Sequence, residues 1–594
     1  MPEPDLVLLH APSVYDFRQE AILYGPIADV APAPFISDIY PGGYASLAEY
    51  LEHGGYRVRV VNLAKHMRDD PAFDAEQAIA ALTPMAFGID FHWLSHAQGA
   101  LAVGQIVKTV HPETPVVLGG LAASYYHREL MTYPQVDYVL RGDSVEEPFL
   151  HLMECLSLGR IPDLVPGLTW RARSGHVIEN PLGTPLASLD DLVFSGNNLA
   201  FGYQQGYPVA LGTVARGCTQ NCLTCGDSAY THKKVYGRQS PCYRSPEKLA
   251  NDLHNLHRYH EGSIYVPCDI TQPGMDYAYR FLQAMRGFPN LLCLDLLQPV
   301  PRKFLQDMFN ALPHLGLQIS MESHDEQVRQ AMGKTYSNSA IEQTILDALS
   351  LGSERLDVHF TIGLPYQDYD SVMATVAYCD DLLSRLGDGG RLQPFIAPLA
   401  PFLDPGSIAF EEPERNGYHL QYHSLEEHRR ALLAPTWKHV LNYETNWMTA
   451  DDIVCATYDA TLEMAKLRAR HGIINSDDAD VVQARVDQTR RLMAEIEQAM
   501  AIDDFDQLQD TLRLLKPEID EVNQSGRING YVLVPRGKYI RRRSDSRGGG
   551  TRGSTQKVLG VLKDWLGRRY RNSRDTVDRA MHSSDPRRQT NMLP

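Results

Sequence analysis

The sequence predicts an α/β protein with two successive parallel sheets, followed by a helical region. Short apolar runs alternate with helical patterns twice, first within residues 1–165 and again within 206–400. Such alternation is typical of parallel sheets whose strands are joined by helices. A chain of 594 residues is also too long for one hydrophobic core, so we expect several domains.

Five regions are expected along the chain. The helical region can cap the barrel and supply a substrate pocket, or it can pack against the barrel wall, and the sequence leaves both open. The regions are a Rossmann-like domain at 1–165, a linker at 166–205, a partial barrel at 206–400, a helical domain at 401–535 and a basic tail at 536–594.

The composition argues against several classes of protein. Nine cysteines, three of them clustered, do not resemble a disulfide framework and favour a reducing cytoplasm. Residues Met1–Asp5 lack the basic start of a signal peptide, and no run of 18 apolar residues predicts a membrane span. The formal net charge of −17 argues against nucleic acid as a partner of the main body.

The C-terminal tail has the opposite charge. Residues Arg536–Pro594 contain 16 Lys/Arg against 5 Asp/Glu, which gives +11 and leaves about −28 for the rest of the chain. We expect this tail to be mostly disordered, with one short helix around residues 558–570. It is interpreted as a solvated tail, with RNA or partner docking as the alternative.

The first domain is expected to contain five strands. Each is a short apolar run, and a helix is expected at 97–110. Ligands of such doubly wound sheets bind at the carboxyl ends of the strands. The strands are expected at 6–9, 57–61, 86–89, 115–118 and 136–140.

Two loops of this domain resemble those of the cobalamin-binding domain that precedes many radical S-adenosylmethionine (SAM) domains. One contains Gly119-Gly120 with Ser124, and the other runs from Arg141 to Glu146. Glycine permits close backbone approach, although a Gly-Gly pair is also an ordinary turn. The resemblance implies cobalamin contacts at His92, Gly119, Gly120, Ser124, Arg141, Gly142 and Glu146.

The usual axial-ligand motif of that domain, D-x-H-x-x-G after the first strand, is not present. The first loop begins His10-Ala11-Pro12, and only Asp90-Phe91-His92, after the third strand, looks like part of the motif. His92 is expected to ligate cobalt, to line the lower face of the corrin or to bond to Asp90. The alternative is a structural Rossmann-like module without the cofactor.

The second sheet is expected to have six strands, and therefore to form a partial (β/α)6 barrel. Helices are expected between the strands, for example at 246–259 and 339–351, and the linker is expected to contain one hairpin at 168–170 and 177–179. The strands are expected at 209–214, 263–266, 291–297, 317–321, 355–362 and 392–396.

A cysteine motif follows the first of these strands. Cys218, Cys222 and Cys225 have the spacing C-x3-C-x2-C, and thiolates suit iron–sulfur clusters. Three ligands leave one iron of a [4Fe-4S] cubane open, and the spacing resembles the radical SAM signature, in which the open iron binds SAM. The alternatives are three unrelated thiols or a zinc site completed by Cys242 or His232.

Other positions match the radical SAM family by their place at strand ends. The resemblance implies SAM contacts at Gly226, Asp269, Glu322, Gly363 and Leu364. Thr224 occupies a position that is commonly aromatic in the family, so adenine stacking is expected from Tyr230 or Tyr236, unless these are core or loop aromatics. Cys242, Cys268 and Cys293 are interpreted as buried thiols.

The resemblance implies a cobalamin-dependent radical SAM methyltransferase. Such an enzyme cleaves SAM reductively with an external donor of the flavodoxin or ferredoxin type, and transfers a methyl group from methylcobalamin to an unactivated carbon. A small natural-product substrate is expected, with the pyrrole-2-carboxyl group of an aminocoumarin antibiotic as one candidate. The alternatives are a rearrangement or cyclisation enzyme without net methyl transfer, and a cluster- or zinc-containing RNA-interaction protein.

Overall fold

The computed structural model describes residues 3–25, 43–192, 209–211, 214–258, 262–387, 389–399, 401–501 and 505–525. The expected tail, its short helix and the last part of the expected linker lie outside these residues. In the described part of the chain, no helix has the length and apolar character needed to cross a membrane. The five-region division stays a prediction.

The first sheet has seven strands in the order β2-β1-β3-β4-β5-β6-β7. The first five are parallel and confirm the predicted strands, whereas the predicted linker hairpin, β6 and β7, adds antiparallel strands to the same sheet. The strands are β1 (Leu6–His10), β2 (Val58–Asn62), β3 (Ala86–Asp90), β4 (Val116–Gly119), β5 (Tyr138–Leu140), β6 (Leu168–Arg171) and β7 (Val177–Glu179).

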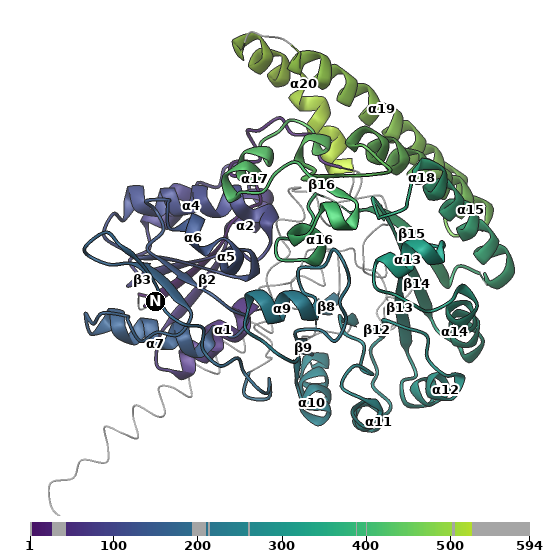
Figure 1. Ribbon diagram of the computed structural model, residues 1–594, viewed down its shortest axis with the longest axis horizontal. Helices are drawn as coiled ribbons and strands as arrows, with labels where there is room; N and C mark the ends of the chain where they lie inside the picture. Colours follow the sequence, from purple (N-terminus) through teal and green to yellow (C-terminus); the bar gives the residue numbers. More distant parts are fainter. Residues whose placement is uncertain are drawn as a thin grey trace, which may run out of the picture. The chain divides into compact units, whose positions relative to one another are not determined.

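Helices cover both faces of this sheet, with α4 on one side and α7 on the other (Figure 1). Strand β1 shows why: Leu6 and Leu8 pack towards α1 and α7, while Val7 and Leu9 pack towards α2–α4. The strand order reverses between β1 and β3, where doubly wound sheets bind ligands. The helices are α1 (Gly43–His53), α2 (Leu63–Asp69), α3 (Ala75–Ala80), α4 (Ala97–Val110), α5 (Leu121–Tyr125), α6 (His127–Leu130) and α7 (Glu146–Ser157).

The second sheet has six parallel strands in the order β15-β14-β13-β12-β11-β8. This arrangement confirms the predicted partial (β/α) barrel. The strands are β8 (Val209–Leu211), β11 (Ser263–Val266), β12 (Leu292–Leu296), β13 (Leu315–Glu322), β14 (Arg355–Ile362) and β15 (Leu392–Pro398).

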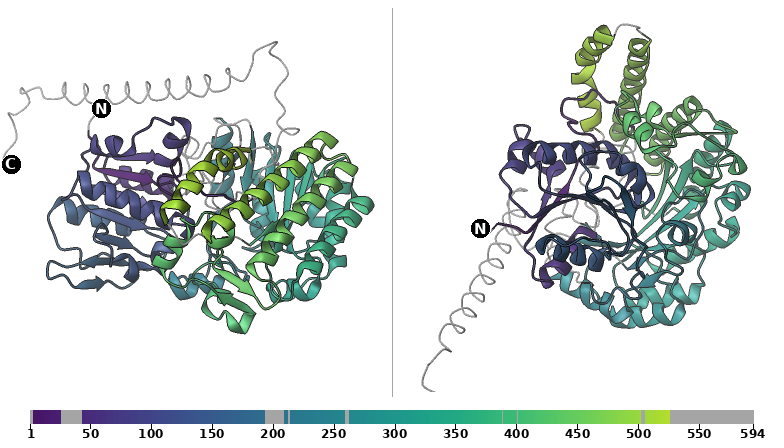
Figure 2. Two further views of the ribbon diagram at one scale, coloured as in Figure 1. Left: turned by 90° about the horizontal axis from the view of Figure 1, so that it is seen from above. Right: turned by 60° about the vertical axis from the view of Figure 1, so that its left-hand side comes forward.

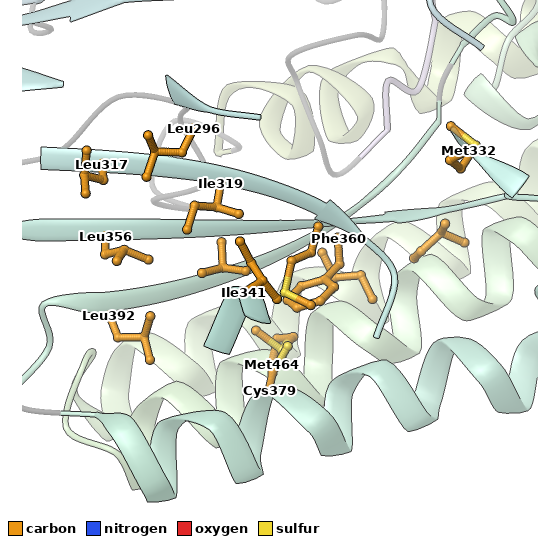
Figure 3. Close-up of a cluster of buried hydrophobic side chains, with 14 of the residues drawn as sticks. Leu296, Leu317, Ile319, Met332, Ile341, Leu356, Phe360, Cys379, Leu392 and Met464 are labelled. Atoms are coloured by element: carbon orange, nitrogen blue, oxygen red, sulfur yellow. The ribbon is translucent and has the colours of Figure 1, made fainter. Parts of the chain in front are cut away.

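One face of the second sheet is apolar and packs against helices. Figure 3 shows side chains of one buried cluster, among them Leu296, Ile319 and Phe360 of the sheet and Cys379 and Met464 of neighbouring helices. The helices are α10 (Pro246–His257), α11 (Met275–Ala284), α12 (Arg302–Ala311), α13 (Glu326–Ala331), α14 (Asn338–Leu351), α15 (Tyr369–Leu386) and, after the sheet, α18 (Ala450–Arg470).

The region after residue 400 contains helices and one antiparallel strand pair. The strands β16 (Tyr418–Leu420) and β17 (Tyr443–Thr445) fall in a region that the sequence predicted to be helical. Helix α18 packs against α15 and β15, hence against the barrel wall, while α19 (Ser476–Met500) and α20 (Phe505–Ser525) lie side by side (Figure 2). The expected substrate cap is therefore not formed by α18.

An N-terminal segment, Glu20–Gly25, is bound by residues from the far end of the chain. Leu23 forms a parallel bridge with Thr436, and its backbone is bonded to Pro435 and Trp437 at 2.8 and 3.0 Å. Asn523 of α20 bonds to the backbone of Ile22 and Tyr24, and Lys516 bonds to the carbonyl of Glu20. The first and last described parts of the chain therefore meet.

Candidate functional site

The three motif cysteines lie in a loop between β9 (Ala215–Arg216) and α9 (Ala229–Val235). Backbone N–H groups of Gln220 and Asp227 each donate to sulfur, to Cys218 and Cys225 respectively, at 3.3 Å. The side-chain amide of Gln272 also donates to Cys218 Sγ, at 3.4 Å. Hydrogen bonds to thiolate sulfurs are a means by which proteins tune iron–sulfur clusters, so this loop fits the cluster.

Two cysteines of this loop, Cys222 and Cys225, lie in surroundings that disfavour the thiolate. Burial raises the pKa of Cys222, partly offset by the charge of Lys334, and raises the pKa of Cys225 well above its ordinary value. Metal coordination deprotonates a thiol outright. In the described residues, no three His, Cys, Asp or Glu side chains converge on a single small ion.

His232 is not available as a fourth zinc ligand. Its Nδ1 donates to Asp143 at 3.0 Å and its Nε2 donates to Asp227 at 2.5 Å. Burial lowers the pKa of His232, but the two hydrogen bonds outweigh it and raise the pKa to about 9. A doubly protonated imidazole has no lone pair for a metal. Cys242, the other candidate, is 4% exposed and sits in β10 (Cys242–Tyr243), opposite Arg216.

The carboxyl end of β13 carries a buried ion pair. Glu322 accepts a hydrogen bond from Lys334 Nζ at 2.7 Å and another from Thr361 Oγ1 at 2.8 Å. Burial would raise the pKa of Glu322, but Lys334 and Thr361 outweigh it and hold the pKa below its ordinary value. The turn that carries Lys334 packs on the cysteine loop, where Leu223 donates to the Met332 carbonyl at 3.3 Å. Glu322 is therefore ionised and close to the cluster loop.

The other predicted SAM residues form hydrogen bonds with neighbouring residues of the protein. Asp269 accepts from Thr271 at 2.6 and 2.8 Å and from the Leu297 backbone at 3.0 Å. The N–H of Gly226 donates to Asp404 at 2.9 Å, and burial raises the pKa of that acid to about 6.

Gly363 and Leu364 follow β14, and their N–H groups donate to Gln367. Gly363 has φ +92°, and a Cβ there would lie 2.3 Å from the Tyr443 hydroxyl. Residues between α15 and α18 therefore reach the strand ends, which places Asp404 and Tyr443 in the part of the site where a cap was expected.

The two predicted cobalamin loops are joined through Ser124. Its hydroxyl donates to the Gly120 carbonyl at 2.7 Å and accepts from the Gly142 N–H at 2.9 Å. Gly120 has φ +125°, and a Cβ there would lie 2.6 Å from the backbone of Phe91 and His92. The glycine is therefore required by contact with the loop after β3, whereas Gly119 has only an ordinary contact and Gly142, at φ +107°, faces open space.

His92 is beside Gly120 but is not bonded to Asp90, so that sequence interpretation is wrong. Both carboxylate oxygens of Asp90 lie 3.0 Å from Nδ1 of His10, at the end of β1. The ring of His92 instead packs edge-on against Trp93, with centroids 4.6 Å apart. Neighbouring strand ends bring His10 and Asp90 together, which the separated sequence positions did not indicate.

Charged side chains connect the predicted cobalamin loops to the cysteine loop. Glu146 is bonded to both terminal nitrogens of Arg216, which lies two residues before Cys218. Asp143 accepts from His232 and also from Arg238, at 2.5 and 3.0 Å. His232 in turn binds Asp227, whose N–H donates to Cys225. Arg141, by contrast, donates to the carbonyls of Gly167 and Asn180, which lie just before β6 and just after β7, and so it does not reach the cysteine loop.

Comparison with known proteins agrees with this geometry. A family model described as a B12 binding domain matches residues 30–150. The magnesium-protoporphyrin IX monomethyl ester cyclase (anaerobic) of Rubrivivax gelatinosus is 26% identical over 237 residues, 39% of this chain and 41% of that protein. The cytidylyl-2-hydroxyethylphosphonate methyltransferase of Streptomyces wedmorensis is 24% identical over 321 residues, 46% of this chain and 59% of that protein. The chain thus matches less than two thirds of either relative's length.

Among solved structures, the radical SAM methyltransferase TsrM from Kitasatospora setae has a similar fold. One structure, with tryptophan substrate and a SAM analogue bound, has a TM-score of 0.54 and 16% identity, covering 80% of this chain and 90% of TsrM. Another, with cobalamin and a [4Fe-4S] cluster bound, has a TM-score of 0.54 and 14% identity, covering 88% and 99%. Residues 30–150 thus resemble a B12 binding domain, and the fold of the chain is similar to that of a radical SAM methyltransferase. The TsrM structures contain cobalamin, a [4Fe-4S] cluster and a SAM analogue, which correspond to the cofactors expected from the sequence.

Sequence reasoning missed several residues of this candidate site: Lys334, Asp404 and Asp227. Asp404 lies 178 residues from Gly226, which it contacts, whereas Lys334 is 12 residues from Glu322 and Asp227 is five from His232; no local pattern marks any of the three. Of the aromatics considered for adenine, Tyr236 is 3% exposed and packs on His232, whereas Tyr230 is partly exposed and bonds to Lys234. Cys242, Cys268 and Cys293 are buried, as predicted.

Proposed function

We propose that this protein is a cobalamin-dependent radical SAM C-methyltransferase acting on a small natural-product substrate. The observation that carries the proposal is the direct link between its two cofactor loops, through Glu146–Arg216 and Asp143–His232. Methyl transfer to a carbon requires that both cofactors act on one substrate, and the link holds their loops in register. The phosphonate relative is also named as a methyltransferase.

The proposed roles of the residues follow from their positions. Cys218, Cys222 and Cys225 hold the cluster, and Glu322 with Lys334 presents a fixed pair of charges beside it for the polar groups of SAM. Ser124, Gly120 and Gly142 shape the cobalamin loops, with His92 alongside. When bound, the cofactors supply reductive cleavage of SAM and a transferable methyl group, while the protein orients them and excludes water.

An external electron donor of the flavodoxin or ferredoxin type and a cytoplasmic location complete the proposal. An antibiotic pathway, with the pyrrole-2-carboxyl group as one candidate target, stays a prediction from the sequence. Neither the donor nor the pathway alters the roles of the residues above.

Product analysis tests the proposal. After anaerobic reconstitution with iron, sulfide and cobalamin, turnover with SAM and substrate extracts is expected to yield S-adenosylhomocysteine and 5′-deoxyadenosine together. The formation of 5′-deoxyadenosine alone would indicate rearrangement or cyclisation. Protein that retains zinc, with neither iron nor cobalt, would contradict the proposal.

A further inference from the structure

The inner face of the second sheet carries polar side chains that the roles above do not use. On β12–β14 the side chains that face the helices, such as Leu294, Leu317 and Val358, are at most 2% exposed. The alternate side chains point to the opposite face, and Asp295 and Gln318 there are partly exposed. This face is therefore accessible, and it is polar.

Three of these side chains form one hydrogen-bonded group. The Tyr265 hydroxyl donates to both carboxylate oxygens of Asp295 at 3.0 Å, and Gln318 Nε2 donates to the Tyr265 hydroxyl at 3.3 Å. They come from three adjacent strands, β11, β12 and β13. Parallel pairing holds them together, because Asp295 lies directly opposite Gln318.

Asp357, a second acid on the same face of the sheet, has a basic partner, whereas Asp295 has none among the described residues. Asp357 lies opposite Gln318 on the other side, is 4% exposed, and is paired with Arg355 Nε at 2.6 Å. Within the described part of the chain, Asp295 has no basic side chain at ion-pair distance; its only hydrogen-bond donor is the Tyr265 hydroxyl. Burial raises the pKa of Asp295 to about 7. One acid is thus compensated by the protein, and the other is not.

His359 provides another unused group on this face, two residues beyond Asp357 along β14. Its Nε2 is buried and has no hydrogen-bond partner among the described residues, and its ring stacks on Phe395 with centroids 5.2 Å apart. Burial lowers its pKa, so the imidazole is neutral. A buried polar atom without a partner is costly, and a bound molecule would supply the missing hydrogen bond.

Lys334 is a cation whose charge acts on Asp295, but its hydrogen bonds go to other groups. Lys334 Nζ donates to Glu322 at 2.7 Å and to the Ser320 carbonyl at 2.5 Å, so it forms no ion pair with Asp295. A partly buried carboxylate with a phenol donor but no cation is best satisfied by a ligand that brings the cation.

We propose that Asp295, supported by Tyr265 and Gln318, binds a positively charged nitrogen of the substrate, with His359 as a neighbouring hydrogen-bonding group. The inference rests on the proposed function, because it places the substrate on the sheet face below the cluster loop. It also argues against a free pyrrole-2-carboxylate, whose negative charge would meet Asp295.

A matched pair of probes tests this without knowledge of the substrate. Phenethylamine, a cation at pH 8, and 2-phenylethanol, its neutral analogue, are titrated into the anaerobically reconstituted full-length protein and followed by calorimetry. The wild-type protein is expected to prefer the amine by about tenfold or more, as a hydrogen bond to a charged group provides. Asp295→Asn is expected to abolish the preference, and Asp357→Asn to retain it while lowering the melting temperature.

A second variant keeps the inference testable if Asp295→Asn does not fold. Gln318→Lys places a cation opposite Asp295 and is expected to abolish the amine preference by occupying the carboxylate. The inference is overturned if the wild-type protein shows no preference, or if both variants retain it. It is also overturned if Asp295→Asn weakens SAM binding and leaves the amine preference intact, because Asp295 would then belong to the SAM site.

Iron and cobalamin contents of the same samples separate this inference from the proposed function. Loaded protein without an amine preference refutes the inference alone. Protein that shows the Asp295-dependent amine preference but loads neither iron nor cobalamin refutes the proposed function, and leaves Asp295 as an amine-binding group without an assigned substrate.

Discussion

The first and second sheets differ in which of their surfaces a ligand can reach. Strands β1 and β3 of the first sheet are buried along their whole length, because helices cover both faces. Strands β13 and β14 of the second sheet alternate between buried and partly exposed side chains towards their carboxyl ends. Strands β1 and β3 can therefore offer a ligand only the loops at their ends, while β13 and β14 of the second sheet also offer one face. Substitutions in the first sheet should therefore change cofactor binding and stability through the shape of the backbone. Substitutions in the second sheet should change them through charge.

The largest effect is expected at the second sheet's cysteine loop. Cys222→Ala removes one of the three proposed cluster ligands, so the iron content of reconstituted protein and the reductive cleavage of SAM are both expected to fall to background. Cys455 is an exposed cysteine on α18, and Cys455→Ala is the matched control, with iron content unchanged. Equal iron content in the two variants would show that Cys222 does not bind the cluster.

A charge effect is next, at the carboxyl end of β13. Lys334→Met leaves Glu322 without its cation, and loss of one partner of a buried pair costs about 3–5 kcal/mol of stability. The double variant Lys334→Met/Glu322→Gln is expected to regain much of this stability in thermal denaturation, yet to bind SAM weakly. Normal SAM affinity in the double variant would show that the pair is structural only.

A backbone effect is expected in the first sheet. Gly120→Ala forces a Cβ against the backbone of Phe91 and His92 at an unfavourable φ, which is expected to cost about 3 kcal/mol. Gly142→Ala also has a positive φ but open space, so the fold should survive while cobalamin absorbance falls. If Gly142→Ala loads cobalamin normally, that loop does not border the cofactor.

The smallest effect concerns pH and the contact between the first sheet's helices and the later region. His428 is fully buried beside Tyr126 and Phe402, and burial lowers its pKa to about 4. A histidine with a lowered pKa stabilises the fold above its unfolded pKa, and this stability is lost as the pH falls from about 6.5 towards 4. About 2 kcal/mol should be lost by pH 5.

The variant His428→Gln should reduce this acid sensitivity, as followed by melting temperature between pH 7 and 5. Some sensitivity should remain, because burial also lowers the pKa of His96, to about 4. An unchanged profile would show that His428 is not the group that responds.

The regular elements could be predicted because each is marked by its own residues. Strands β11 and β14 and helix α4 have the bounds that the apolar patterns indicated. The short strand β16 was missed, since three residues carry too little periodicity, and the addition of the β6–β7 hairpin to the first sheet depends on pairing with β5.

The site was only partly predictable for a related reason. The cysteines lie within eight residues, so their spacing is visible in the sequence. Contacts such as His10 with Asp90, Asp143 with His232 and Asp295 with Tyr265 join residues 30 to 89 positions apart. Only the tertiary fold brings them together, and one sequence does not reveal such pairs.

The bonded segment Glu20–Gly25 has a consequence for synthesis of the chain. Its partners lie at Pro435–Trp437 and at Asn523, so this segment emerges from the ribosome about 410 residues before its first partners and about 500 before its last. At roughly 5–20 residues per second, the wait is about 20–100 s. During that time the first sheet can assemble, while the segment Glu20–Gly25, between β1 and α1, keeps backbone donors and acceptors that have not yet met their partners.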